Sequence, residues 1–453
     1  MHPIGCANDR RRGDSLGRHS LLLLAAAQVG NASNLLFQWA MMRGLSDAEY
    51  GTTAALLSGA LAISSAMEAL RASVARQVAK LQAAGAGAAA LGRVVVRWAL
   101  GLVAAAAVLA VAAAIWAEPV AEMFALGDPR RALLAAGLVG ASLFMPLMAG
   151  ALQGMQSFGW FAVSAQAFGV VRLMVGAALV FGVSATAGAA LVGQGLGVAA
   201  SVALGLVGWR IALARARAFA PTAVGADLAE DVRAEGGYFA RALPALAAFG
   251  VLMSADAPVA RLGLGPDAAG AFARAAMMAR AVVFLPMPIA LAVFPKIVSR
   301  TSEEAEIRSL RRRSGAYVAF LVVVSCLAAW WFGAPIWTVW TGRRPTTDEG
   351  RMLRALIVAM APLGGVYLQI NIHLAMGRWK SAWVVIPFAL LYVLAVVVCR
   401  AKPLEIAVVL AICAWSALAA LVAAGRRTRP SMTTPASDLR PAPGEPLAAR
   451  ARS

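Results

Sequence analysis

The sequence carries little charge. Asp, Glu, Lys and Arg make up only 14% of its 453 residues, whereas 61% are hydrophobic and the mean hydropathy is +0.74. Soluble globular domains have about 25% charged residues. This composition excludes an ordinary soluble protein and indicates an integral membrane protein.

Cysteine and histidine are also scarce, with four and three residues respectively. Cys6, Cys326, Cys399 and Cys413 form no CxxC pair, and three of them lie in apolar runs, where a thiol behaves as a small hydrophobic group. His373, in "LQINIHLAMGRWK", has no partner at metal-ligand spacing. The sequence therefore predicts no disulfide framework, no metal site and no cofactor, and it gives no signal of an enzyme.

Acidic residues are few relative to basic ones, 22 against 41, so the formal net charge is +19. The basic residues lie in short clusters between hydrophobic runs, without the interleaved aromatic residues of a nucleic-acid-binding surface. We therefore expect no nucleic-acid partner. The clusters instead indicate membrane topology and contact with anionic membrane lipids.

The hydrophobic residues form about twelve runs near the length that an α-helix needs to cross roughly 30 Å of hydrocarbon. We expect an all-α integral membrane protein with helices at 20–42, 51–74, 94–117, 132–154, 158–182, 185–208, 238–262, 269–295, 314–340, 352–376, 380–399 and 404–424. One set of alternate loops holds about 24 Lys and Arg residues and the other about 10. This asymmetry predicts that both termini lie in the cytoplasm and that the protein resides in the inner (cytoplasmic) membrane.

The order of these segments predicts two lobes of about six helices each. We assign 1–19 to a cytoplasmic N-terminal segment, 20–208 to the first lobe, 209–237 to a cytoplasmic linker between the lobes, 238–424 to the second lobe, and 425–453 to a disordered cytoplasmic tail rich in Pro, Ala, Ser, Thr and Arg. The N-terminus superficially resembles a signal peptide, but its apolar stretch continues to Met42. We therefore expect an uncleaved first helix.

Two short segments indicate that the lobes arose by duplication. "GLSDAEYG" at 44–51 and "GLGPDAAG" at 263–270 each join the first helix of a lobe to the second. Gly44, Leu45 and Gly51 each have an identical residue 219 positions later. Because an even number of helices separates the copies, we expect a parallel repeat with pseudo-two-fold symmetry about an axis along the membrane normal.

Five charged residues lie within the predicted spans away from their ends or only partly near them: Arg71, with Glu68 beside it, Arg172, Asp256, Arg274 and Arg280. Arg71 is three residues after Glu68, so the two can form a local pair while Arg71 reaches the interface. Asp256 and Arg274 lie at similar depth on either side of the 263–270 turn, which predicts an ion pair between them. A second role for Asp256, in which it titrates and couples transport to an ion, remains open.

Arg172 and Arg280 lie near the middle of their spans with no acid within one helical turn. A guanidinium stays protonated, so each must find a carbonyl group, water or an anion. Two or three such cations in a watery cavity suit a diphosphate, which arginine engages bidentately. The alternative is that these arginines bond backbone carbonyls between packed helices.

Proline and glycine residues give two further expectations. Pro286, Pro288 and Pro295 should break or bend the eighth helix, as a moving transporter requires. Gly193, Gly195 and Gly197, in "LVGQGLGVAA", lie in an apolar helix and indicate a close-packing surface rather than a phosphate loop.

The segment "SADAPVARLGLGPDAAGAFARAAMMARAVVFLPMPIALAVFPKIVSR", at 254–300, resembles the start of the second half of bacterial polysaccharide flippases. "NLLFQWAMMRGLSDAEYGTTAALLSGALA", at 34–62, is similar to the corresponding part of their first half. These flippases share a superfamily with multidrug exporters and the lipid II flippase. The resemblance implies two six-helix lobes arranged as a V that rock between inward-open and outward-open states around a central cavity.

The resemblance also implies a function, the movement of polyprenyl-diphosphate-linked glycan from the inner to the outer leaflet. The excess of arginine over acid in the spans favours such an anionic head group over cationic drugs, with Arg71, Arg172, Arg274 and Arg280 as substrate-binding candidates and Asp256 as an ion-pair or coupling residue. The expected partners are the lipid-linked anionic glycan, membrane lipids and glycan-synthesis enzymes, and the expected state is a monomer.

Three alternatives stay open. One is a drug or metabolite antiporter of the same fold, which would more naturally have unpaired acids in its cavity. Another is a membrane glycan polymerase or ligase, but this class needs a long outside loop with catalytic Arg or His, and the outside loops here are short. The last is a scaffold of the same fold that does not transport.

Overall fold

The computed structural model describes residues 28–123, 126, 128–217, 227–287, 289–290, 293, 297, 304–399 and 402–427, and these residues form helices and short turns. A first helix is described over 28–44. The labelled helices of the first lobe are α2 (Asp47–Ala83), α3 (Ala88–Met123), α4 (Pro129–Ser142), α5 (Phe144–Gly154), α6 (Phe158–Gly182) and α7 (Ala187–Arg217). Those of the second lobe are α8 (Asp227–Ser254), α9 (Asp256–Gly263), α10 (Pro266–Ala279), α11 (Ala281–Phe284), α13 (Glu304–Thr341), α14 (Thr347–Met360), α15 (Leu363–Ala375), α16 (Trp379–Ala382), the 3₁₀ helix η1 (Trp383–Val385), α17 (Ile386–Cys399) and α18 (Pro403–Arg427).

Ten helical segments within the described ranges are long and apolar enough to cross a membrane. They match the predicted spans, except that the first and eighth fall partly outside the described residues. The predicted N-terminal segment and most of the predicted tail also lie outside them. In the predicted 209–237 linker, α7 continues to Arg217 and α8 starts at Asp227, so the described part of this segment is helical.

Polar side chains define where several helices begin. The Ser46 hydroxyl accepts a hydrogen bond from the Glu49 amide, 3.3 Å away, at the start of α2. At the start of α14, Thr346 and Glu349 form a reciprocal capping box. These caps satisfy amides that have no partner within the helix. They fix the starts of two helices whose acidic first turns belong to the site described below.

Several spans are built from two helices in line, separated by a break. α8 and α9 meet at Ala255, α10 and α11 meet at Arg280, and α11 ends at Phe284, followed by a turn at Leu285 and Pro286. The predicted proline break of the eighth helix is therefore confirmed at Pro286, whereas Pro288 and Pro295 lie outside the described residues. At a helix break, backbone carbonyl groups lose their hydrogen-bond partners within the helix. Such carbonyl groups can then accept hydrogen bonds from buried arginines.

The predicted repeat is confirmed by a contact between its matched glycines. A β-carbon on Gly51 of α2 would lie 3.0 Å from the Cα atom of Gly270 in α10, and one on Gly270 would lie 1.8 Å from the Asp47 carbonyl oxygen. Only glycine permits backbones to approach this closely. A residue that touches its own repeat counterpart lies at the pseudo-two-fold axis, so α2 and α10 cross at this axis.

Helix breaks and turns repeat with nearly the same spacing. The break after α4 is at Leu143 and that before α15 is at Pro362, and 362 − 143 gives the same offset of 219. The turns that follow contain Gln156 with φ 54° and Gly377 with φ 69°, and each is closed by the same pair of backbone hydrogen bonds. The duplication thus extends through the fourth and fifth helices of each lobe.

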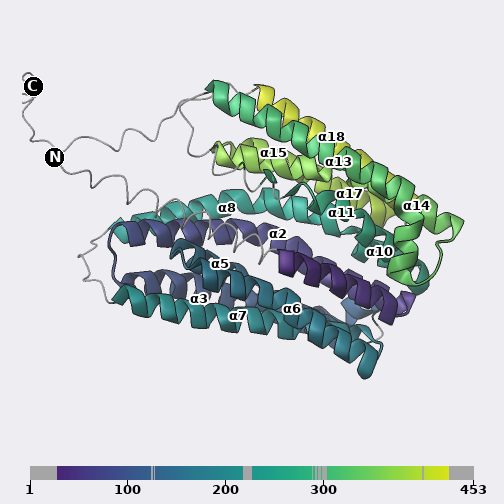
Figure 1. Ribbon diagram of the computed structural model, residues 1–453, viewed down its shortest axis with the longest axis horizontal. Coiled ribbons are helices and arrows are strands. Elements are labelled where there is room, and N and C mark those ends of the chain that lie inside the picture. The colour runs from purple at the N-terminus through teal and green to yellow at the C-terminus, as the bar shows by residue number, and fades with distance from the viewer. Residues whose placement is uncertain are drawn as a thin grey trace, which may run out of the picture.

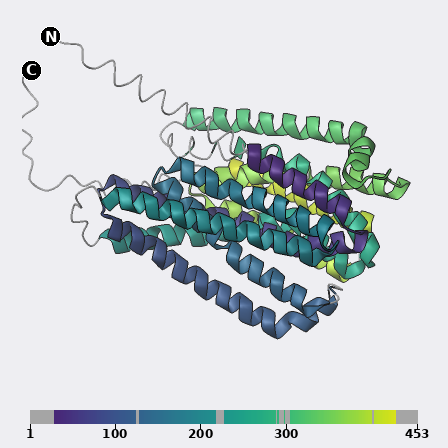
Figure 2. The ribbon, with the colours of Figure 1, turned by 60° about the horizontal axis from the view of Figure 1, so that its bottom comes forward.

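The two lobes lie side by side in Figure 1, with α2, α3, α5, α6 and α7 in one and α13, α14, α15, α17 and α18 in the other. α8 runs between them along α2, and α10 lies beside α14 at the right of the view. Figure 2 shows α3 and α4 in blue along one edge and α13 in green along the other. In α3 and α13 only 6% of the apolar window is buried, so the third helix of each lobe is peripheral.

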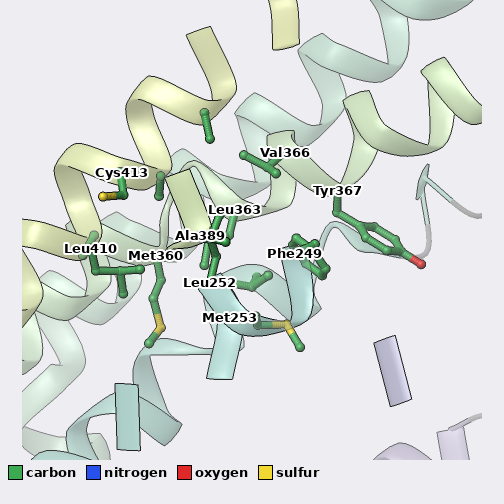
Figure 3. Close-up of a cluster of buried hydrophobic side chains, with 14 of the residues drawn as sticks. Phe249, Leu252, Met253, Met360, Leu363, Val366, Tyr367, Ala389, Leu410 and Cys413 are labelled. Atoms are coloured by element: carbon green, nitrogen blue, oxygen red, sulfur yellow. The ribbon is translucent and has the colours of Figure 1, made fainter. Parts of the chain in front are cut away.

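The core of the second lobe is apolar and draws on most of its helices. Figure 3 shows Phe249, Met360, Tyr367, Leu410 and Cys413 converging from α8, α14, α15, α18 and their neighbours. The first lobe has its own cluster, centred on Leu70, Val74, Leu91, Leu147 and Leu152. Because each lobe buries a separate core, the lobes can in principle move as rigid units.

Candidate functional site

Asp256 is held in an ion pair at a helix break. The Arg280 guanidinium pairs with the Asp256 carboxylate, and its Nε donates to the Met253 carbonyl at 3.1 Å. Both side chains are buried, Asp256 completely. Asp256 begins α9 and Arg280 lies between α10 and α11, so both breaks contribute to this pair. One carboxylate oxygen, Asp256 Oδ2, has no hydrogen-bond partner among the described residues.

Arg274 lies on α10 and reaches across to the first lobe. Its Nε is 2.9 Å from the Asp47 carboxylate, one Nη donates to the Leu45 carbonyl at 2.9 Å, and the other donates to the Met42 carbonyl. These carbonyl groups belong to the end of the 28–44 helix, where they have no partner within the helix and carry the negative end of its dipole. Arg274 therefore binds the end of the first helix to α10.

The predicted ion pair between Asp256 and Arg274 is wrong, since Asp256 pairs with Arg280. The prediction treated the seventh and eighth helices as continuous, and on an ideal helix Arg280 points about 120° away from Arg274. That separation is kept, because the Arg280 amide still donates to the Ala276 carbonyl at 3.0 Å, and it points Arg280 toward Asp256 and Arg274 toward the first lobe. The free carbonyl groups at the end of the 28–44 helix and the Asp47 carboxylate then hold Arg274.

Arg172 is buried in the first lobe on α6, and its contacts are with neutral groups. It donates to Gln194 Oε1 at 3.0 Å and to Asn34 Oδ1 at 2.7 Å. The rings of Phe37 and Phe168 lie 4.2 and 4.7 Å from its guanidinium carbon. Arg172 Nε is buried and has no hydrogen-bond acceptor among the described residues.

Glycines bring the helices around Arg172 close together. A β-carbon on Gly193 would lie 2.5 Å from the Cα atom of Gly176, and one on Gly197 would lie 2.7 Å from the Phe168 carbonyl oxygen. The prediction that Gly193 and Gly197 form a close-packing surface is confirmed. This packing fixes α6 against α7 and so fixes the position of Gln194 beside Arg172.

Arg71 forms the predicted local pair with Glu68. Its Nε lies 3.0 Å from Glu68 Oε2, and an Nη atom donates to Gln153 Oε1 at 3.2 Å. Of the four predicted substrate-binding arginines, Arg274 lies on α10, 5.0 Å from the centroid of the Tyr50 ring, and Arg280 ends the same helix. Arg71 and Arg172 have separate partners in the first lobe, so the four do not converge on one point in this conformation.

A cross-lobe polar network that the sequence did not predict lies at one end of the lobe interface. Besides Arg274, Arg343 of the second lobe approaches Asp47 at 3.6 Å and is held by Glu349 at 2.6 and 2.8 Å. These hydrogen bonds to Glu349 raise the pKa of Arg343 above its usual value, so it stays charged. The capping residues that precede α2 and α14 mark the starts of these helices in the sequence. This signal could have been used to predict that Asp47 and Glu349 lie at the same end of the lobe interface.

Two further groups tie the lobes together near the same end. Arg43 and Trp39 of the first helix both donate to the Val339 carbonyl of α13, at 2.9 and 3.1 Å. Arg261 of α9 donates to the Thr52 hydroxyl at 2.8 Å. By the predicted topology this end faces outside, so the structure is closed at its outer end.

Contacts near the opposite end of the lobe interface include aromatic rings. The Arg76 guanidinium carbon lies 3.8 Å from the Tyr238 ring centroid, and the Trp98 and Phe239 rings pack edge to face with centroids 5.6 Å apart. Within the described ranges, no group of three or more His, Cys, Asp or Glu side chains could hold a metal ion.

No family model matches the chain, and no curated protein matches it. Solved structures do match. An inward-facing multidrug resistance MATE family transporter of the MOP superfamily superimposes with a TM-score of 0.65 and 12% identity, covering 90% of this chain and 100% of the other. Lipid II flippase MurJ in an inward closed conformation gives 0.59 and 12%, covering 90% and 87%.

A third similar structure is a MOP superfamily transporter from Pyrococcus furiosus, with a TM-score of 0.55, 14% identity and coverage of 91% and 96%. The chain has the fold of these transporters. An outward-facing MATE structure gives a lower TM-score, 0.57, than the inward-facing one. Together with the apolar spans, this fold makes the chain a multi-pass membrane protein whose two lobes have the arrangement that the resemblance implied.

Proposed function

We propose that the protein is an alternating-access transporter that flips a polyprenyl-diphosphate-linked glycan from the inner to the outer leaflet. Two separately packed lobes that cross at Gly51 and Gly270 provide the pivot that such motion needs. The network of Asp47, Arg274 and Arg343 closes one end. Breaking this network while the inner end closes would expose the interface to the opposite side.

The observation that carries the choice of substrate is Arg172. A buried guanidinium in a membrane is costly unless an opposite charge compensates it. Here its hydrogen-bonding partners are two amide oxygens, and its Nε donor is unused within the described residues. The missing counter-charge can come from a diphosphate head group, because phosphate oxygens accept bidentate bonds from arginine.

The neighbouring folds allow more than one substrate polarity. One similar structure is a multidrug transporter, one is a lipid II flippase, and the transporter from Pyrococcus furiosus carries the description "Reverse polarity of binding pocket". A fold that hosts pockets of either polarity leaves the choice to the residues of this chain. The net positive charge at Arg172 favours an anion.

A cation antiporter is the second candidate function, and Asp256 is the observation that favours it. This carboxylate is completely buried and has one oxygen without a partner among the described residues. If Arg280 moved away during transport, Asp256 could bind a proton or a cationic compound, either as the coupling site of a flippase or as the substrate site of an antiporter. Arg280, Arg274 and Arg71 all have carboxylate partners in the closed conformation, so Arg172 ranks first as the head-group ligand.

The test is movement of a fluorescent polyprenyl-diphosphate glycan between leaflets of proteoliposomes. We expect Arg172→Gln to lower the rate about tenfold or more, since losing one charge-assisted contact is worth roughly 1.5–3 kcal/mol. Arg172→Lys should keep part of the activity, because the charge survives without the planar fork. Arg351→Gln is the matched control, because Arg351 is highly exposed and only loosely paired.

Transport of a cationic dye without movement of the glycan lipid would instead establish the antiporter.

Orientation in the membrane is tested separately with single cysteines in a background where the native cysteines are replaced. Cysteines at Ser46, the cap of α2, and at Thr347, the first residue of α14, should react with an impermeant reagent from outside. The predicted inside position, Ser302, lies outside the described residues.

A further inference from the structure

A shallow groove runs along the surface of α18. Its volume is about 490 Å³, and among the described residues the side chains that line it come from three turns of this helix: Trp415, Leu418, Ala419, Val422, Ala423 and Arg426. Ala419 and Ala423 are exposed and small, so they form the floor between the larger Trp415 and Arg426. The groove is apolar along its length and carries a positive charge at one end.

The length of the groove matches one leaflet of a bilayer. Trp415 and Arg426 are eleven residues apart, which corresponds to about 16 Å along a helix. The hydrocarbon of a single leaflet is about half of the roughly 30 Å core. An acyl chain with its head group beside Arg426 would therefore extend along the groove to the neighbourhood of Trp415.

Two more arginines lie at the charged end. Arg311 of α13 donates to the Gly425 carbonyl at 3.3 Å, and its guanidinium packs directly against Gly425. The backbone amide of Arg378 donates to the His373 carbonyl at 2.8 Å, and the His373 ring contacts the Leu421 carbonyl of α18 at 3.1 Å. Three elements thus bring Arg311, Arg378 and Arg426 to the same end of α18.

The charges of these arginines act on one another. Arg311 lies against Gly425, the residue that precedes Arg426, so like charges from α13 and α18 meet at this end. Like charges at close range are destabilising, and an anion shared among them removes the repulsion. By the predicted topology this end faces the cytoplasm, where the inner leaflet carries anionic lipids.

We propose that the α18 groove binds an anionic phospholipid of the inner leaflet, with its phosphate between Arg311 and Arg426 and one acyl chain over Ala419 and Ala423. The charge complementarity and the leaflet-length apolar floor select this occupant. The site is on the surface of the second lobe and is independent of what the protein transports. A bound lipid here would link α13 to α18 and so brace the second lobe.

The test is native mass spectrometry of the full chain released from nanodiscs that contain phosphatidylglycerol and phosphatidylcholine. We expect the wild type to retain phosphatidylglycerol preferentially. The double variant Arg311→Gln with Arg426→Gln should weaken this retention about tenfold through loss of two interfacial charges. Ala423→Phe, which fills the groove without changing the charge, should weaken it as well, and Ala419→Phe serves if that variant misfolds.

Two controls match these changes. Arg351→Gln removes an exposed arginine at the other end of the protein, and Ala107→Phe adds the same bulk to the exposed surface of α3. Neither should alter retention. Unchanged retention in the double arginine variant or in both groove-filling variants would overturn the proposal.

Other occupants give distinct results. If Ala423→Phe converts an oligomer into a monomer, the groove holds a second copy of the chain and the lipid proposal is wrong. If polyprenyl diphosphate displaces phosphatidylglycerol in competition, the groove belongs to the transported lipid and the proposal is again wrong. Because leaflet movement of the glycan is measured separately, failure of the lipid site does not bear on the proposed transport.

Discussion

Arg172 of the first lobe and Arg280 of the second are both buried, and their charges are compensated differently. Arg172 in the first lobe is 8% exposed and bonds the amide oxygens of Asn34 and Gln194. Arg280 in the second lobe is 3% exposed and pairs with Asp256. The first site retains a positive charge and the second is neutral. This difference separates an arginine that is available to an anion from one that holds the protein together.

Local backbone structure explains the difference. Arg172 lies in the middle of α6, a continuous helix whose carbonyl groups bond within the helix, so its partners must be side chains. Arg280 lies between α10 and α11, opposite the break at Ala255, so the Met253 carbonyl and the first residue of α9 are within reach. Broken helices thus create the neutral site and an unbroken helix creates the charged one.

The largest expected effect is on stability, from Asp256→Asn. This change leaves the Arg280 charge buried without its carboxylate, which typically costs about 3–5 kcal/mol. The double change Asp256→Asn with Arg280→Gln should recover much of that loss, because no charge remains uncompensated. Unfolding in mixed micelles measures both. Recovery by Arg274→Gln in place of Arg280→Gln would contradict the observed pairing.

The second-largest effect is expected on transport, when the uncompensated arginine of the first lobe is given a carboxylate partner like that of Arg280. Asn34→Asp places an acid at the position that now accepts from Arg172 at 2.7 Å. The new ion pair neutralises the site, so we expect stability to hold while glycan-lipid movement falls roughly tenfold. Asn34→Gln, which stays neutral, is the control. Undiminished transport by Asn34→Asp would show that the charge on Arg172 is not needed.

A smaller effect is expected at the cross-lobe network. Asp47→Asn weakens the contacts with Arg274 and Arg343 without touching either buried site, and Asp47 is partly exposed. We expect a cost of about 1 kcal/mol and a shift toward the outward-open state. Spin labels at Ser46 and Thr347 should report a larger population of long distances. An unchanged distance distribution would mean that this network does not hold the outer end closed.

The smallest effect is expected at Glu68 and Arg71. Their side chains are 40% and 24% exposed, so solvent screens the pair. Glu68→Gln should change the unfolding free energy by about 0–1 kcal/mol. The same unfolding measurement tests this, with Asp256→Asn as the reference. A loss comparable to that of Asp256→Asn would show that Arg71 belongs with the buried arginines.

Sequence patterns were sufficient for the spans, the repeat and the local pair. Apolar run length placed the helices, the 219-residue offset found the glycines at the pseudo-two-fold axis, and a spacing of three placed Glu68 beside Arg71. The spans, the repeat and the local pair all depend on features that are close together in the chain or that recur along it. Such features appear in the sequence as a fixed length or a fixed spacing.

The partners of the buried arginines could not be predicted in the same way. Depth alone suggested Asp256 for Arg274, but the two arginines point in different directions, Arg280 to Asp256 and Arg274 to Asp47 of the first lobe. The backbone carbonyls that hold Arg274 have no sequence signature, since every residue has one. Asn34 and Gln194 are neutral polar residues with no signal in the sequence that links them, and only the packing of their helices shows that they meet Arg172.

The most direct test of the central claim, that the first lobe supplies the charge that captures an anionic head group, is a binding measurement. Polyprenyl diphosphate and the uncharged polyprenol are titrated against nanodisc-embedded wild type, Arg172→Gln, and the double variant Asp256→Asn with Arg280→Gln. The account predicts that the wild type prefers the diphosphate, that Arg172→Gln loses this preference about tenfold, and that the double variant keeps it. Loss of the preference in the double variant, with Arg172→Gln unaffected, would place the head group in the second lobe and contradict the account.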